Sequence, residues 1–120
     1  MRVEDKYYFE YTQYIQLDSL VLCAYIKSME IDYDTRKDQA NHAKHGISLA
    51  DATDLEWETL WAMEDRRRDY GECRMIGYAL MGERLYCVVF TDRGEIRRII
   101  SLRKANNREI KHYVQAVEAE

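Results

Sequence analysis

Apolar side chains recur at every second position over several stretches of the C-terminal half, a pattern that predicts β-strands. One strand is expected over 57–63 and another over about 72–80. Residues 84–103 predict a hairpin, because the aliphatic and aromatic run 85–90 suits a buried sheet and Gly94 provides the backbone freedom of a short turn. The pattern therefore indicates a sheet built mainly from consecutive antiparallel strands.

Helical signals flank these strands. A short strand at 31–33 precedes a helix over 34–44, which an aspartate can cap and Gly46 can close. A serine and an aspartate form a capping-box-like start to a second helix over 48–55. A last helix begins after a possible asparagine cap at position 106, and its apolar stripe consists of Ile110, Tyr113, Val114 and Val117.

The first 29 residues differ from the rest. Half of the ten tyrosines lie there, and apolar positions from Tyr11 to Ile26 fall near helical spacing. This segment is either an added amphipathic helix or a stretch upstream of the true start. The order of elements in the remainder segregates helices from a run of strands, so residues 30–120 are expected to form one α+β domain.

Charge is distributed unevenly along the chain. The net charge is −4, yet residues 1–65 carry six Lys and Arg against 14 Asp and Glu, whereas residues 66–112 carry 12 against six. Local field governs the attraction of a polyanion, so RNA is expected on the basic half. Three cysteines with no Cys-x-x-Cys pair indicate reduced thiols in a cytoplasmic protein.

Four of the cations lie in eight residues of the second hairpin strand, at positions 97, 98, 103 and 104. Regular alternation predicts that Arg98 shares a face with Ile96, Ile100 and Leu102, and that Ser101 and Arg103 lie on the opposite face with Arg97 and Ile99. Guanidinium groups fixed on a rigid sheet are well suited to hold a phosphate diester.

These residues also carry a family resemblance. The segment 98–105 (RIISLRKA) resembles the signature of the BrnT toxins, the ribonuclease half of the BrnT/BrnA toxin–antitoxin pairs. Two upstream pieces fit in the same order: Lys44-His45-Gly46 with the SLADA segment 48–52, and the stretch from Asp65 through Tyr70-Gly71-Glu72 to Arg74. The resemblance covers about 30–117. Arg97 replaces a usually apolar residue, and Arg66 stands where proline is common.

The resemblance implies the RelE-like fold, an antiparallel sheet with helices packed against it. It also implies the toxin of a type II system, a cytoplasmic endoribonuclease that inhibits translation and growth and is neutralised by a BrnA-like antitoxin. Operator DNA would then be contacted only through the toxin–antitoxin complex. The alternative is a non-catalytic RNA- or protein-binding module on the same scaffold.

Cleavage of RNA without a metal needs a base for the 2′-OH, cations for the charged phosphorane and an acid for the leaving oxygen. The sequence has no set of metal ligands with the spacing of a metal site, so neither a metal nor another cofactor is expected. The candidate catalytic residues are Lys44, His45, Glu72, Arg98 and Arg103. The candidate substrate-binding residues are Arg67, Ser101 and Lys104.

Each candidate has a structural alternative. Arg98 could pair with a carboxylate at the edge of the core, and His45 and Lys44 could interact with the helix end. Glu72 could be the base or could pair with Arg74 or Arg103, and Arg67 lies in a charge run of the kind that is usually a solvated loop.

Overall fold

The computed structural model describes residues 30–119. The proposed extension over 1–29, with the helix suggested by the spacing from Tyr11 to Ile26, lies outside the described residues. The elements follow in the order β1 (Glu30–Tyr33), α3 (Thr35–His45), η1 (Leu49–Asp54), β2 (Glu56–Glu64), β3 (Met75–Met81), β4 (Arg84–Arg93), β5 (Ile96–Lys104) and α4 (Asn107–Glu118). The predicted α+β class is confirmed.

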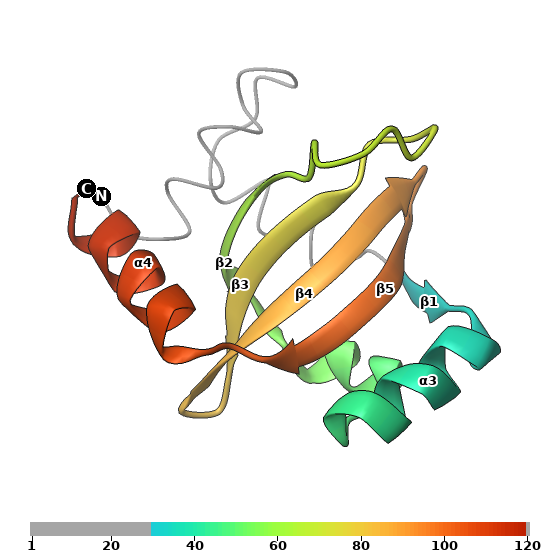
Figure 1. Ribbon diagram of the computed structural model, residues 1–120, viewed down its shortest axis with the longest axis horizontal. Helices are drawn as coiled ribbons and strands as arrows, with labels where there is room; N and C mark the ends of the chain where they lie inside the picture. Colours follow the sequence, from blue (N-terminus) through green and yellow to red (C-terminus); the bar gives the residue numbers. More distant parts are fainter. Residues whose placement is uncertain (1–29, 120) are drawn as a thin grey trace.

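The five strands form one sheet in the order β1-β5-β4-β3-β2. Strands β2 to β5 pair with their sequence neighbours in antiparallel fashion, as the hairpin signals predicted. At one edge the sheet departs from the antiparallel pattern, because β1 pairs with β5 in parallel. Figure 1 shows α3 and η1 close together beside β5 and β1, with α4 at the opposite end of the sheet.

The helix boundaries follow the predicted capping residues. Asp34 accepts hydrogen bonds from the first turn of α3, and Gly46 adopts a left-handed conformation with φ 73° and donates its N–H to His42 O. Asn106 and Glu109 form a capping box at the start of α4. The second helix is η1, a short 3₁₀ helix that Ser48 caps.

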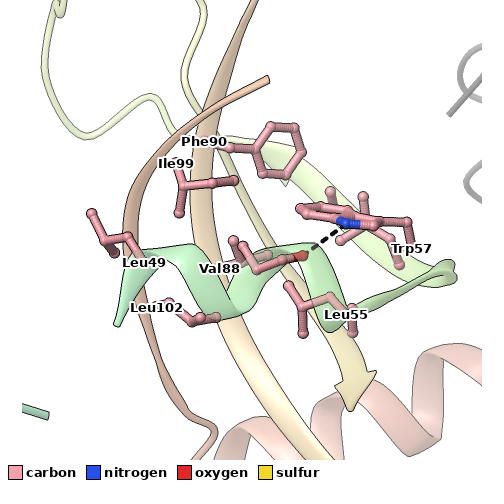
Figure 2. Packing of buried hydrophobic residues seen from close by; sticks show 11 residues of the cluster. Leu49, Leu55, Trp57, Val88, Phe90, Ile99 and Leu102 are labelled. Carbon is pink, nitrogen blue, oxygen red and sulfur yellow. Dashed lines mark hydrogen bonds between the residues drawn. The ribbon is translucent and has the colours of Figure 1, made fainter. Parts of the chain in front are cut away.

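Two clusters of buried side chains lie on opposite faces of the sheet. The larger one packs Leu49 and Leu55, from the η1 segment, against Phe90, Ile99 and Leu102 of the sheet (Figure 2). Trp57 belongs to the same cluster, and its Nε1 donates to Ala52 O at 3.0 Å. On the other face, α4 packs Tyr113 and Ala116 against Trp61 and Leu85. Both faces of the sheet are therefore partly covered, by different helices.

A buried arginine lies within the larger cluster. The guanidinium of Arg97 is 4.2 Å from the ring centre of Phe90 and 4.8 Å from that of Trp57. It donates to both carboxylate oxygens of Asp92, at 2.8 and 2.9 Å, and its side chain is 1% exposed. The family departure at this position is therefore accommodated by two aromatic faces and one carboxylate.

The predicted alternation of β2 is wrong. Trp57 and Trp61 lie in different clusters, because the pairing of β2 with β3 shifts between Glu56 and Trp61. The Thr59 hydroxyl accepts the Leu80 N–H at 2.9 Å within this irregular stretch, so a side chain supplies a partner where the regular ladder is interrupted.

The predicted faces of β5 are also wrong, for a similar reason. Phe90 pairs with Ile99 and Val89 pairs with Ser101, which leaves Ile100 as an extra residue in β5. Ile99 and Leu102 consequently lie in the same buried cluster. Arg98, Ser101 and Arg103 share the face on which α4 packs. The bulge thus brings together polar residues that regular alternation separates.

Asn41, which has no distinguishing signal in the sequence, joins α3 to the edge of β5. Its amide nitrogen donates to Leu102 O at 2.8 Å and to Ile47 O at 2.9 Å, and its oxygen accepts the Leu102 N–H at 3.2 Å. β1 pairs with β5 only as far as Ile99. Beyond that point the buried Asn41 side chain provides the hydrogen-bond partners that a longer β1 would offer to Leu102.

Replacing Asn41 with alanine is expected to destabilise the fold by about 2–3 kcal/mol, because it leaves main-chain groups of Leu102 buried without a partner. Urea unfolding followed by circular dichroism measures this loss. Gln39→Ala, at an exposed position of the same helix, is the matched control and should change stability by less than about 0.5 kcal/mol. Equal stability of the two variants would contradict the bridging role.

Candidate functional site

Arg67, Arg98, Ser101 and Arg103 define a surface that we call the cationic face. The last three residues project from β5 on the side of α4, opposite Thr91, Val89 and Cys87 of β4. The β4–β5 pairing and the bulge at Ile100 determine their common orientation, so the arrangement follows from the sheet itself. Arg67 comes from the loop between β2 and β3.

Arg98 is held loosely at the β1 edge. Its Nη1 lies 3.2 Å from Asp32 Oδ2, and its Nη2 lies 3.9 Å from Asp34 Oδ2. The guanidinium side chain is 28% exposed, and both carboxylates are more exposed still. Ion pairs of this kind contribute little to stability, so an anionic ligand can compete with them. The structural alternative for Arg98, an edge arginine paired with a carboxylate, describes its state in the free protein.

Arg103 is held tightly. Its Nη1 and Nη2 each donate to one carboxylate oxygen of Glu109 at 2.8 Å, and Nη1 also donates to Lys104 O at 3.2 Å. Planar bidentate pairs of this kind fix orientation as well as distance. The pair joins the end of β5 to the first turn of α4.

The Glu109 carboxylate gathers donors from three elements. Besides Arg103 it accepts the Asn106 N–H at 2.9 Å and the Tyr78 hydroxyl at 3.2 Å. The hydrogen bonds from Arg103 are the main reason why the pKa of Glu109 falls to about 2, and those from Asn106 and Tyr78 act in the same direction. Glu109 is therefore ionised at every pH at which the protein would act.

Arg67 is organised by a buried aspartate. Its Nε and Nη2 donate to the two carboxylate oxygens of Asp65 at 2.8 Å, and the Tyr70 hydroxyl donates to the same carboxylate at 3.1 Å. The hydrogen bonds from Arg67 hold the pKa of Asp65 far below its usual range. The Arg67 side chain remains 72% exposed. The buried Asp65 therefore holds the loop in place, while the Arg67 guanidinium faces solvent.

Cys87 is the β4 residue opposite Arg103. Burial raises its pKa to about 11, while the positive charges of Arg103 and Arg67 act in the opposite direction. Both guanidinium groups are therefore close enough to act on one buried atom of β4. The protonated thiol is a poor nucleophile, so Cys87 serves as part of the floor of the cationic face.

Glu72 pairs with Arg93 rather than with Arg74 or Arg103. Its carboxylate oxygens lie 2.9 and 3.2 Å from nitrogens of Arg93, and these hydrogen bonds are the main cause of its lowered pKa. Arg74 instead stacks on the Tyr70 ring, 3.8 Å from its centre. A carboxylate with a lowered pKa is a weaker proton acceptor, which makes Glu72 a less suitable base.

His45 and Lys44 are exposed at the end of α3. The backbone of Gly46 closes this helix, so the imidazole is not needed as a cap. The pKa of His45 is lowered chiefly by desolvation, and then by the positive charges of Lys44 and Arg103. The ring is therefore neutral at pH 7 and can accept a proton. The effect of Arg103 indicates that His45 lies at the border of the cationic face.

The structure brings some of the predicted residues together and separates others. Arg98, Ser101 and Arg103 project from the same face of β5, the charge of Arg67 reaches Cys87 on that face, and the charge of Arg103 reaches His45. Glu72 lies near Thr91, the residue opposite Arg98, and its carboxylate is engaged by Arg93. Lys104 is exposed on the opposite face of the sheet, and the residue next to it on β4 is Tyr86. The eight candidate residues therefore do not all lie on one face of the sheet.

Sequence reasoning missed the carboxylates that hold the arginines. Asp32 lies 66 residues from Arg98, so only the parallel pairing of β1 with β5 brings them together. Glu109 carried a readable signal, since Asn106 and Glu109 have capping-box spacing, but that signal does not indicate a contact with Arg103. In the sequence, Asp65 stands out only as the first residue of the family-like stretch 65–74.

Two further features of residues 30–119 concern metal binding and membrane insertion. Nowhere in this range do three His, Cys, Asp or Glu side chains gather in a way that could hold a metal ion. None of the helices in it is long and apolar enough to cross a membrane.

An α+β fold that carries two arginines and a serine on one sheet face, with a third arginine in the β2–β3 loop, has side chains of the kind that bind phosphate-bearing ligands. The family model described as the ribonuclease toxin BrnT of type II toxin–antitoxin systems matches residues 33–109. The match covers well over half of the chain, so this protein belongs to the BrnT ribonuclease toxin family. A ribonuclease toxin of a type II system has RNA as its substrate and a cognate antitoxin as its partner. A search of curated proteins finds no match.

Proposed function

We propose that this BrnT-family toxin cleaves RNA internally and without a metal ion, and that the cationic face holds the scissile phosphate. The single observation that carries the proposal is the common orientation of Arg98, Ser101 and Arg103, which the bulge in β5 produces. Two guanidinium groups on a rigid sheet stabilise the negative charge that develops on the phosphorane. Ser101 donates a hydrogen bond to a phosphate oxygen.

Geometry and charge support the roles that we propose for the remaining residues. His45 takes the 2′-OH proton as the general base, supported by its lowered pKa and its place beside Arg103. Lys44, next to it on α3, adds positive charge at the same border. Glu72 is the second candidate base, and its pairing with Arg93 counts against it. Arg67 binds RNA beside the cleaved bond, whereas Lys104 can reach only RNA that wraps around the end of β5.

Cutting RNA in a cytoplasmic location would inhibit translation and arrest growth, as expected of an uninhibited toxin. Purified protein incubated with RNA in EDTA tests the proposal directly. Cleavage should proceed at the same rate with and without the chelator. Intact RNA in EDTA, with cleavage restored by added Mg²⁺, would show that the reaction depends on a metal.

A non-catalytic RNA- or protein-binding module remains the second candidate. It is favoured by one observation: Arg67, Arg98 and Arg103 each have a carboxylate partner in the free protein, which reduces the field available to the phosphate. Binding of RNA without any cleavage, by folded protein in a wide range of buffers, would support this second candidate.

We further propose that the cognate antitoxin resembles BrnA and silences the toxin by covering the cationic face. Acidic and apolar side chains of the partner would compete with RNA for Arg98 and Arg103, so binding and cleavage should exclude one another. DNA contact would then belong to the partner within the complex.

Adding the purified antitoxin to a cleavage reaction is expected to abolish cutting at a one-to-one ratio. Crosslinks from the antitoxin should map to β5 and to the loop that carries Arg67. A tight complex that leaves the cleavage rate unchanged would contradict inhibition by occlusion.

A further inference from the structure

Glu109 has more contacts than the start of a helix requires. A capping box needs a Glu or Gln side chain to accept the N–H of the capping residue, and Glu109 does so with Asn106 at 2.9 Å. A glutamine would serve this purpose equally well. The bidentate pair with Arg103 and the hydrogen bond from Tyr78 are additional, and both reach from α4 to the sheet.

The contacts of Arg103 leave a defined part of its guanidinium available. Nη1 and Nη2 are engaged with Glu109, whereas Nε donates to no acceptor within residues 30–119. The side chain is 33% exposed. Because the Glu109 carboxylate is itself fixed by a main-chain N–H and a tyrosine hydroxyl, the plane of the guanidinium is set before any ligand arrives.

Arg98 provides a comparison within the same face. Its two acidic neighbours contact it at 3.2 and 3.9 Å and are 45% exposed, whereas the Glu109 side chain is 15% exposed. Only Arg103 among the arginines of β5 on this face is held by a bidentate pair with a partly buried carboxylate. The two arginines therefore differ in how firmly the protein orients them.

We propose that Glu109 is a positioning residue for RNA cleavage, which orients the guanidinium of Arg103 toward the scissile phosphate. This inference rests on the proposed function, in which Arg103 contacts the phosphate. Glu109 itself does not touch RNA. Its contribution is to hold Arg103 in one orientation, so it affects the rate of the chemical step more than the affinity for RNA.

Glu109→Gln is the informative substitution, because it keeps the size of the side chain and an oxygen that can accept the Asn106 N–H, but removes the charge. It is expected to lower kcat about tenfold and to change KM by less than about threefold. Glu118→Gln makes the same chemical change at an exposed position of α4 and should leave both constants unchanged. Asn106→Ala removes only the other half of the capping box, and its kcat should stay within about twofold of the wild type. An equal loss of kcat in Asn106→Ala and Glu109→Gln would reduce Glu109 to a capping role and overturn the proposal.

A double substitution separates this inference from the proposed function. In an Arg103→Lys background, where the guanidinium fork is absent, Glu109→Gln should change kcat by less than about twofold. A further tenfold loss in that background would overturn the positioning role, because Glu109 would then act independently of Arg103.

A full cleavage rate in Arg103→Ala would overturn the proposed site itself, and the positioning role with it. Should Glu109→Gln fail to fold, Tyr78→Phe carries the same test, since it removes one donor to the carboxylate without altering charge. It should lower kcat about threefold in the wild type and leave the rate of Arg103→Lys unchanged.

Discussion

Replacing either Arg98 or Arg103 with alanine is expected to slow RNA cleavage by roughly two to three orders of magnitude, since a charge-assisted contact made in the transition state contributes about 2–4 kcal/mol. Single-turnover rates with a labelled RNA measure the loss directly. The loss of rate should be larger for Arg103→Ala than for Arg98→Ala. Glu109 orients Arg103 through two short hydrogen bonds, whereas Arg98 contacts its more exposed acidic neighbours at longer distances.

Arg36→Ala is the control for a general loss of positive charge. Arg36 is exposed in the first turn of α3, and its replacement should leave the rate within about twofold of the wild type. Folding of each variant can be verified by thermal unfolding. If both alanine variants at β5 fold and cut at the normal rate, these arginines are structural and the cationic face is not the site of cleavage.

Arg97→Ala is expected to destabilise the protein by about 3–4 kcal/mol, because it leaves a cavity beside two aromatic rings and removes one partner of Asp92. Arg97→Met should cost about 1 kcal/mol or less, since it refills the space beside Trp57 and Phe90 while Asp92, whose side chain is 25% exposed, remains in contact with water. Urea unfolding provides both values.

The comparison of the two Arg97 variants decides what holds this part of the core. A loss with methionine as large as that with alanine would mean that the ion pair, rather than packing against the rings, stabilises the position. A small loss with methionine would also explain how family members can have an apolar residue where this chain has arginine.

Element types and boundaries could largely be predicted from the sequence, because they depend on local chemistry. Asp34, Gly46 and Asn106 lie where main-chain groups at helix ends need partners, and the alternating runs mark the strands of the hairpin. The β1–β5 pairing could not be predicted in this way, since parallel contacts between distant segments have no local signal.

The candidate site could be predicted only in part, because a single extra residue changes which side chains share a face. Regular alternation placed Arg98 on the opposite face from Ser101 and Arg103, and the bulge at Ile100 reverses that assignment. The partners Asp32 and Glu109 become apparent only when the strands and α4 are assembled. The candidate cations can therefore be read from the sequence, whereas the carboxylates that contact them cannot.

The most direct test of the central claim is the chemistry of the RNA ends after cleavage in EDTA. Attack by the 2′-OH on a phosphate held at the cationic face should yield a 2′,3′-cyclic phosphate and a 5′-hydroxyl, and a single 2′-deoxy substitution at the cleaved position should block the reaction. Arg103→Ala should give the same ends at a greatly reduced rate. Products with a 5′-phosphate, or cleavage that continues at the 2′-deoxy position, would contradict the proposed mechanism.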